Sequence, residues 1–253
     1  MTYAHVNDLD VYYETHGTGE PLVLLHGGLL TIELTFAAML PELARTRRVI
    51  AIELQGHGHT ADTDREFTLD RLADDVVGVL DEVGVERADF FGFSLGGLVA
   101  LQVAMRHPVR AGRLAAAGVH FRADGYRPGV FDMDSGSELL PTDADFQAMH
   151  DAYVAVAPDP GRFEAFAAKA SALPAELDWS AEDLGKVRSP VLIIVGDLDF
   201  VRVEHAAEMR ELIPDARLAV LPDTTHMDLL RRADRVLPLV GEFLGQRESG
   251  PRG

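Results

Sequence analysis

Ser94, inside the G-x-S-x-G pattern Gly92–Gly96, has the surroundings of a catalytic nucleophile. Apolar residues typical of a buried strand precede it, and an apolar helical stretch runs from Leu98 to Met105. A sharp strand–helix turn exposes a serine hydroxyl above the sheet, and flanking glycines let the two elements pass closely. The alternative is a structural turn with a capping serine. We interpret Ser94 as the nucleophile, with the Leu95 amide at the helix start as an oxyanion donor.

A serine hydroxyl needs a base to take its proton and a third group to hold that base. Of the ten histidines, His226 lies after the last expected strand and before the closing helix. Two carboxylates, Asp197 and Asp199, follow the strand expected at 191–195. Asp197 directly follows that strand, where it would bond backbone amides in a turn, so we assign the acid to Asp199. The chain order serine, aspartate, histidine is that of one class of serine hydrolases.

The loop after the apolar run at 22–25 should supply the second oxyanion donor. The Gly28 amide is our candidate, because nothing projects from its Cα. His26 in the same loop is expected to pack and hydrogen-bond there. His57 and His59 have the spacing of metal ligands, but they lie in a glycine-rich turn without an acidic pair. No metal or cofactor is therefore expected.

The side chains expected around the substrate are mostly apolar or aromatic and come from the catalytic loops and the middle of the chain. They are Leu29, Phe93, Phe131, Met133, Tyr153, Trp179, Phe200 and Met227. For each of them, ordinary core packing is at least as good an interpretation. As a pocket, they would suit a small, largely apolar substrate.

Elements that could position these groups are visible as apolar runs and helical patterns. Runs typical of strands buried on both faces occur at 22–25, 49–52, 90–91 and 191–195. A helix is expected at 69–83, and a final strand at 217–221 precedes a closing helix at 227–243. Alternating strands and helices require right-handed crossovers, which predicts an α/β fold with a doubly wound, mostly parallel sheet.

The region 120–188 interrupts this alternation. It contains no strand pattern of comparable quality, but helices are expected at 143–155 and 162–172. We therefore expect a core made of 1–119 and 189–253, with a helical insertion between its two parts.

Composition limits the partners that the chain can take. The 253 residues carry a formal charge of −18, which repels nucleic-acid phosphates and anionic membrane surfaces. The absence of cysteine excludes disulfides and thiol chemistry. The first ten residues lack the features of a signal peptide, so we expect a cytoplasmic protein that binds a small molecule, neither nucleic acid nor membrane. The oligomeric state stays open.

Five motifs together resemble the α/β-hydrolase superfamily: His26–Gly28, Gln55–Thr60, Gly92–Gly97, Gly196–Asp199 and His226. The resemblance covers nearly the whole chain. It implies an eight-stranded sheet, a small helical cap between strands six and seven, and the roles given above to the serine, the acid and the histidine. Esterases, lactonases, carbon–carbon bond hydrolases, perhydrolases and hormone-like receptors belong to this superfamily.

The chain departs from the superfamily pattern at several positions. Glu53 and Gln55 replace the usual Asp and Arg, Thr60 replaces a serine, and Thr225 replaces the glycine before the histidine. Some relatives place the acid after strand six, where only Asp124 could serve, and we rank it below the acid assigned above.

These observations predict a serine hydrolase that cleaves a carboxylic ester or lactone through an acyl-enzyme. Two alternatives stay open. The same triad could cleave a carbon–carbon bond, or the protein could be a ligand-binding receptor with vestigial hydrolase activity.

Overall fold

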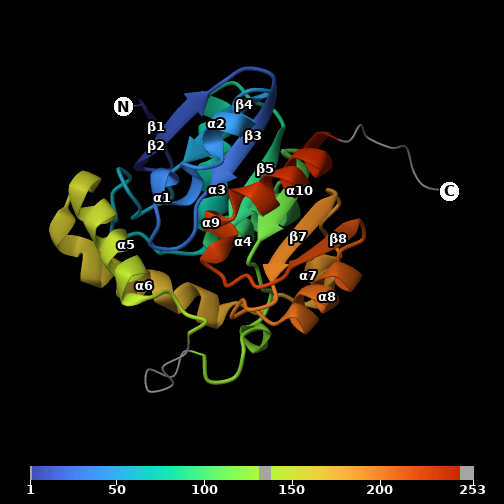
Figure 1. The fold of residues 1–253 in the computed structure, drawn as a ribbon. Coiled ribbons are helices and arrows are strands. Elements are labelled where there is room, and N and C mark those ends of the chain that lie inside the picture. The colour runs from blue at the N-terminus through green and yellow to red at the C-terminus, as the bar shows by residue number, and fades with distance from the viewer. Residues whose placement is uncertain (1, 131–137, 246–253) are drawn as a thin grey trace.

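The computed structural model describes residues 2–130 and 138–245, which form one central sheet with helices on both sides (Figure 1). Phe131 and Met133, two of the expected substrate contacts, lie outside the described residues. Among the described residues, no helix is long and apolar enough to cross a membrane.

The sheet has eight strands in the order β1-β2-β4-β3-β5-β6-β7-β8. Their bounds are β1 Thr2–Val6, β2 Leu9–His16, β3 Glu20–Leu25, β4 Arg47–Ile52, β5 Ala88–Phe93, β6 Ala111–Ala117, β7 Val191–Gly196 and β8 Ala216–Leu221. β1 and β2 form an antiparallel ribbon whose turn residues Asn7 and Asp8 both have positive φ, as two-residue hairpins prefer. β2 also pairs antiparallel with β4, and every further pair from β4 to β8 is parallel.

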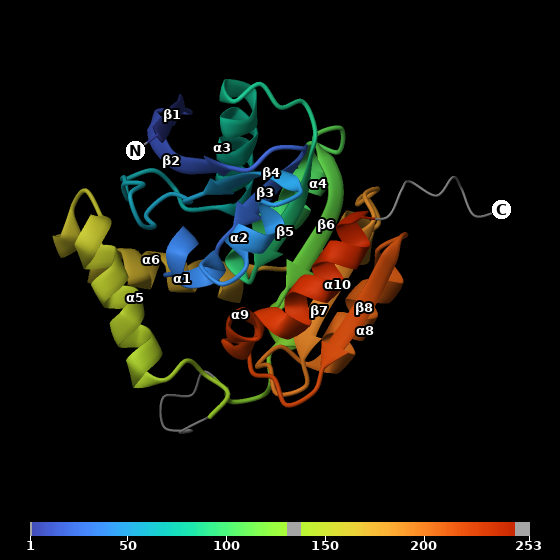
Figure 2. The same cartoon turned by 45° about the horizontal axis from the view of Figure 1, so that its top comes forward.

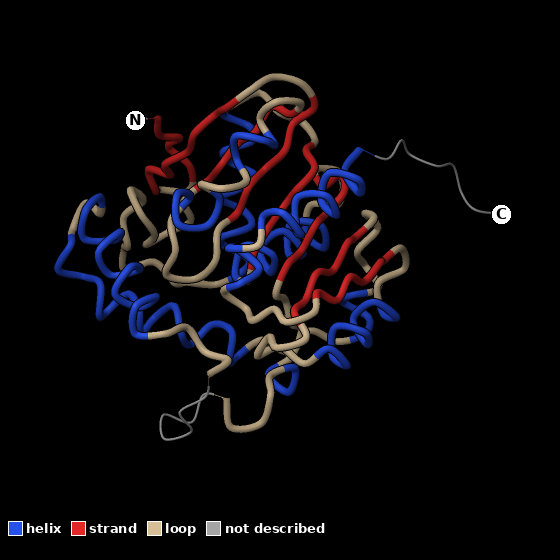
Figure 3. The backbone as a smooth tube through the Cα atoms, in the orientation of Figure 1, coloured by secondary structure: helices blue, strands red, loops and turns tan. Residues whose placement is uncertain are grey.

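Helices cover both faces of the sheet, as Figures 2 and 3 show. One face carries α3 (Leu69–Glu82), α4 (Leu95–Arg106) and α8 (Val203–Leu212), and the other carries α1 (Ile32–Phe36), α2 (Leu40–Leu43), α9 (Asp228–Arg231) and α10 (Ala233–Gly245). Alternate strand residues point to opposite faces, so Val23 and Leu25 join the first cluster while Leu22 and Leu24 join the second. This confirms the expected doubly wound α/β fold.

The polypeptide between β6 and β7 contains no strand in its described part. It contains the short helices η1 (Ala123–Gly125), η2 (Pro160–Arg162) and α7 (Ala181–Leu184), and the longer helices α5 (Asp143–Val156) and α6 (Phe163–Glu176). Thr142 and Asp145 cap α5 reciprocally, each side chain accepting the other's amide proton. α5 lies apart from the two helical layers (Figure 2), whereas α6 contributes Leu173 to the core cluster that contains α3 and α4. The packing of Phe166 on α6 against Gly56 and His57 places α6 over the loop that follows β4.

Candidate active site

Ser94 occupies a strained turn between β5 and α4. Its φ of 50° and ψ of −119° are rare for a residue with a side chain, and its amide donates to the carbonyl of Ala117 at 2.7 Å. A Cβ added to Gly92 would lie 2.4 Å from the Gly96 carbonyl oxygen, and one added to Gly96 would lie 2.1 Å from that of Leu25. The two glycines of the motif are therefore required by close backbone packing.

The structure brings Asp199 and His226 together. His226 Nδ1 lies 2.9 Å from Asp199 Oδ1, and both side chains are buried. Asp199 Oδ1 also accepts the Val201 amide at 3.0 Å, whereas its Oδ2 has no hydrogen-bond partner among the described residues. Asp197 instead accepts the Thr224 amide at 3.2 Å. A carboxylate on Nδ1 fixes the tautomer in which Nε2 is free to accept a proton.

The imidazole of His226 lies between two phenylalanine rings. Its centroid is 4.0 Å from that of Phe200, which it stacks on, and 4.7 Å from that of Phe93. A Cβ on Gly118 would lie 2.6 Å from His226 Cε1, so the missing side chain makes room for the ring at the end of β6. Phe200, expected to contact substrate, is thus positioned to hold the candidate base His226.

The Ser94 turn and His226 meet at the end of β6, because Ser94 is bonded to Ala117 and His226 contacts the next residue, Gly118. The Ser94 hydroxyl has no hydrogen-bond partner within the described part of the chain. Serine–histidine hydrogen bonds are often long in enzymes without substrate and tighten in the complex.

Two backbone amides are available near the serine as oxyanion donors. Leu95 is the first residue of α4, so its amide has no acceptor within the helix. Among the described residues, the Gly28 amide makes no hydrogen bond, and a Cβ at Gly28 would meet nothing within 4 Å. Leu29, with φ of 60°, directs its amide away to His57 Nε2 at 3.0 Å. The expected donors Gly28 and Leu95 therefore remain unengaged.

Two buried histidines hold the loops around these donors. His26 Nε2 accepts the Leu54 amide at 3.0 Å, and its Nδ1 lies 2.8 Å from the Gly27 carbonyl. His57 Nδ1 donates to the Gln55 carbonyl at 3.0 Å. Burial lowers the pKa of His26. The pKa of His57 is lowered well below its usual value, mainly by burial and secondly by the electrostatic effect of the nearby His26. Both rings are neutral hydrogen-bonding groups of the loop.

The H-x-H pair does not form a metal site within the described residues. His59 Nδ1 lies 2.9 Å from Glu53 Oε2, and its ring stacks on Tyr12 at 4.1 Å. Both ring nitrogens of His57 are already hydrogen-bonded. No group of three or more potential metal ligands occurs among the described residues. Asp124, the alternative acid, pairs with Arg122 on the surface.

The remaining residues that were expected to contact substrate lie in different parts of the structure. Leu29 packs against the cluster that contains Tyr153 on α5, so the loop that carries Gly28 and Leu29 is in contact with the insertion. Met227 is the N-cap residue of α9, is half-buried, and packs against the core cluster that contains α9 and α10. Trp179 packs against the cluster on the opposite face of the sheet, and its amide donates to the Phe121 carbonyl at 2.9 Å. Trp179 therefore contributes to core packing, the second interpretation offered by the sequence.

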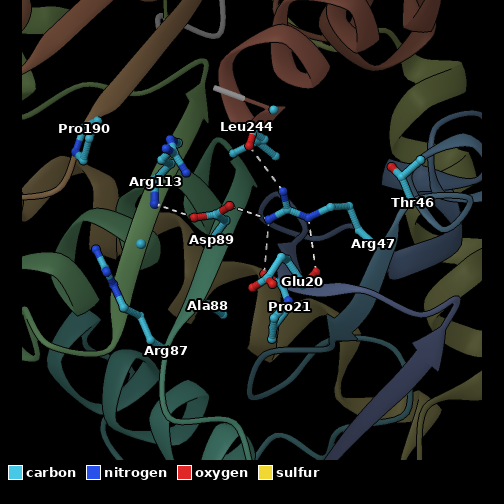
Figure 4. A pocket seen from close by; sticks show the side chains of 12 residues that line it. Glu20, Pro21, Thr46, Arg47, Arg87, Ala88, Asp89, Arg113, Pro190 and Leu244 are labelled. Atoms are coloured by element: carbon cyan, nitrogen blue, oxygen red, sulfur yellow. Dashed lines mark hydrogen bonds and ion pairs between the residues drawn. The ribbon is translucent and has the colours of Figure 1, made fainter. Parts of the chain in front are cut away.

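A cavity of about 630 Å³ lies at the ends of the strands opposite to Ser94 (Figure 4). It is lined by the amino-terminal ends of β3 to β6, whereas Ser94 follows the carboxyl end of β5. Arg47 in its wall binds Asp89 and donates to the carbonyls of Glu20 and Leu244. These contacts tie strand ends to the last helix, so we assign this cavity a structural role.

A strand–turn–helix serine on such a sheet is the architecture of α/β hydrolases. Residues 22–239 match the model of the alpha/beta hydrolase family, and the chain belongs to that family. It is 31% identical to 2-hydroxymuconate semialdehyde hydrolase of Pseudomonas sp. strain CF600, over 92% of this chain and 89% of the relative. It is 30% identical to the pimeloyl-[acyl-carrier protein] methyl ester esterase of Neisseria meningitidis, over 83% and 72% respectively.

Among solved structures, the meta-cleavage product hydrolase of Pseudomonas fluorescens IP01 superimposes with a TM-score of 0.79. Its sequence is 24% identical, and the match covers 96% of this chain and 97% of that one. At this identity the likeness supports the fold alone. Family membership and fold together show that the protein is a hydrolase.

Proposed function

We propose that the protein hydrolyses a carboxylic ester or lactone of a small, largely apolar substrate through a serine-bound acyl-enzyme. The observation that carries this proposal is the buried 2.9 Å contact between Asp199 and His226, adjacent to the strained turn of Ser94. A buried histidine–carboxylate pair next to a serine at such a turn is the arrangement needed to activate a hydroxyl.

In the first half-reaction, His226 Nε2 takes the proton of Ser94 Oγ as the oxygen attacks the substrate carbonyl carbon. The carbonyl electron pair moves onto oxygen, where the Gly28 and Leu95 amides would stabilise it. Collapse of this intermediate breaks the ester C–O bond, and the leaving alkoxide receives the proton from His226. Asp199 stabilises the imidazolium that exists between the two proton transfers.

In the second half-reaction, water attacks the acyl carbonyl and gives its proton to His226. The tetrahedral intermediate collapses, the acid leaves, and Ser94 Oγ recovers the proton. Losing one oxyanion donor typically costs about 3 kcal/mol of transition-state stabilisation.

The charges of the insertion favour an uncharged substrate. Arg162 and Lys169 both bind Asp62, at 3.0 and 2.8 Å. Arg127 donates to two backbone carbonyls. These cations are engaged by the protein, and the overall charge of −18 opposes association with an anion.

Cleavage of a carbon–carbon bond is the second candidate, because the Pseudomonas relative that matches 92% of this chain is a 2-hydroxymuconate semialdehyde hydrolase. The same triad could serve that reaction. A muconate carries a carboxylate, however, and the engaged cations described above weigh against binding it here.

A substrate panel distinguishes the two reactions. We would measure p-nitrophenyl esters of increasing acyl length, γ- and δ-lactones, and 2-hydroxy-6-oxo-dienoates with wild type, Ser94→Ala and the control Ser171→Ala. Ser171 is an exposed serine on α6 whose hydroxyl bonds the Ala167 carbonyl. We expect ester or lactone turnover and a fluorophosphonate adduct in wild type and Ser171→Ala only. Turnover of dienoates alone would favour the second candidate. Labelling of Ser94→Ala equal to that of wild type would show that Ser94 is not the nucleophile.

A further inference from the structure

The segment 122–130, which lies before α5 and α6 in the insertion, is joined to the loop that carries the candidate acid. Tyr126 and Val201 form an isolated antiparallel bridge. The Arg127 amide donates to the Phe200 carbonyl at 2.9 Å, and the Arg202 amide donates to the Gly125 carbonyl at 2.8 Å. The backbone next to Asp199 is thus paired with a segment some 70 residues earlier in the chain.

The side chain of Arg127 adds a second connection to the same loop. Its Nε donates to the Asp199 carbonyl at 2.8 Å, and its Nη2 donates to the Asp197 carbonyl at 2.7 Å. A planar guanidinium holds two acceptors in a fixed relative position, which an ammonium on a flexible stem does not. The two carbonyls on either side of Leu198 are therefore fixed relative to each other.

The position of the loop backbone matters because the carboxylate of Asp199 makes few hydrogen bonds of its own. Its Oδ1 meets His226 and the Val201 amide, and its Oδ2 has no hydrogen-bond partner among the described residues. A rotation of the 197–199 backbone would move the carboxylate away from the imidazole. The amides of 197–199 donate to the carbonyls of Leu221, Thr224 and Gly196, and the Asp197 side chain accepts the Thr224 amide, so the fork adds the restraint on the carbonyl side of the loop.

We propose that Arg127 is a positioning residue for the catalytic acid: its guanidinium fork sets the backbone of 197–199 so that Asp199 meets His226 Nδ1. This inference rests on the proposed function and adds to it a residue that touches no substrate. It acts through the loop backbone, and the first part of the insertion thereby contributes to the triad.

Arg202 offers a matched control. It joins the same two segments, but its Nε and Nη2 donate to the Asp124 carbonyl, at 3.2 and 2.7 Å, and touch neither carbonyl of the acid loop. We would compare wild type, Arg127→Gln, Arg127→Lys and Arg202→Gln in the full chain. The measurements are kcat and KM on the best ester, the thermal midpoint, and the low-field NMR signal of the His226 Nδ1 proton.

We expect Arg127→Gln to lower kcat by about 10- to 100-fold with little change in KM, because small misplacements of catalytic groups have effects of this size. Its low-field proton signal should move or broaden. Arg127→Lys should lose about 10-fold, because it keeps the charge but not the fork. Arg202→Gln should stay within about threefold of wild type, since it leaves the acid loop untouched.

Equal losses of kcat and thermal midpoint in Arg127→Gln and Arg202→Gln would show that the fork is merely structural and would overturn the inference. An unchanged low-field signal in Arg127→Gln would do the same. The signal needs no substrate, so it tests the inference even if the wild type hydrolyses no ester or lactone. A wild type that hydrolyses no ester or lactone would instead count against the proposed function.

Discussion

The buried imidazole of His57 accepts a hydrogen bond from the amide of Leu29 at 3.0 Å. This bond requires the neutral ring, because a protonated imidazole has no acceptor. It also takes up the amide next to Gly28, at a residue held at φ of 60°. Protonating His57 would therefore break the contact that shapes the loop of the candidate oxyanion donor Gly28.

This relationship predicts a loss of stability in mild acid. The folded-state pKa of His57 is depressed, so the unfolded chain binds a proton near pH 6.5 while the folded chain does not. The stabilising contribution is complete above pH 6.5 and is lost as the pH falls below it. Urea unfolding at pH 7.5 and 5.5 should show wild type losing about 1 kcal/mol more than His57→Gln, since each pKa unit is worth about 1.4 kcal/mol. Identical losses in both proteins would contradict the assignment.

The two aspartates after β7 provide a matched pair for the acid. Asp199→Asn should lower kcat by about 10⁴-fold, because an amide stabilises the wrong tautomer of the histidine and no imidazolium. Asp197→Asn should keep kcat close to wild type, since Asn still offers an oxygen to the Thr224 amide. Steady-state kinetics on the best ester measures both. A larger loss in Asp197→Asn would reassign the acid.

The residues of the candidate triad were easier to predict from the sequence than the residues that support them. The nucleophile turn and the order serine, aspartate, histidine are local patterns, and the structure places Asp199 beside His226 and His226 next to the Ser94 turn. Arg127 carries no local signal, because its role depends on a pairing with residues 70 or more positions away. The spacing of His57 to His59 is visible in the sequence, but the contact of His57 with Leu29 depends on how two loops fold together.

The fold shows the same limit at β6. Ala111–Ala117 contains four alanines and a glycine, a composition that resembles neither a strand of branched residues nor an amphipathic helix. It is nevertheless a buried strand between β5 and β7, and only its place in the sheet reveals this. The closing helix expected at 227–243 is interrupted at Arg232, which donates to the carbonyls of Pro222 and Asp223.

A second matched pair tests the oxyanion donor. Gly28→Ala keeps the amide and places a Cβ in open space, so activity on small esters should stay within about threefold of wild type. Gly28→Pro removes the N–H and should lower kcat by about 10²- to 10³-fold, the usual effect of losing one donor. Both variants should unfold within a few degrees of wild type by circular dichroism. Equal kcat in the two would show that another group holds the oxyanion.

The Asp62 carboxylate connects the helical insertion to the core and gives the last prediction. Its side chain is 2% exposed and binds both Arg162 and Lys169, which also donates to the Thr63 carbonyl. Asp62→Asn should lower the free energy of unfolding by about 2 kcal/mol, because hydrogen bonds to charged groups are each worth about 1.5–3 kcal/mol. Asp64, fully exposed and 3.5 Å from Arg162, provides the control, since surface pairs of this kind contribute little. Because α6 packs on the loop containing His57, we also expect KM to rise in Asp62→Asn and not in Asp64→Asn. Matching stabilities and KM values in the two variants would show that the insertion is held by its apolar contacts alone.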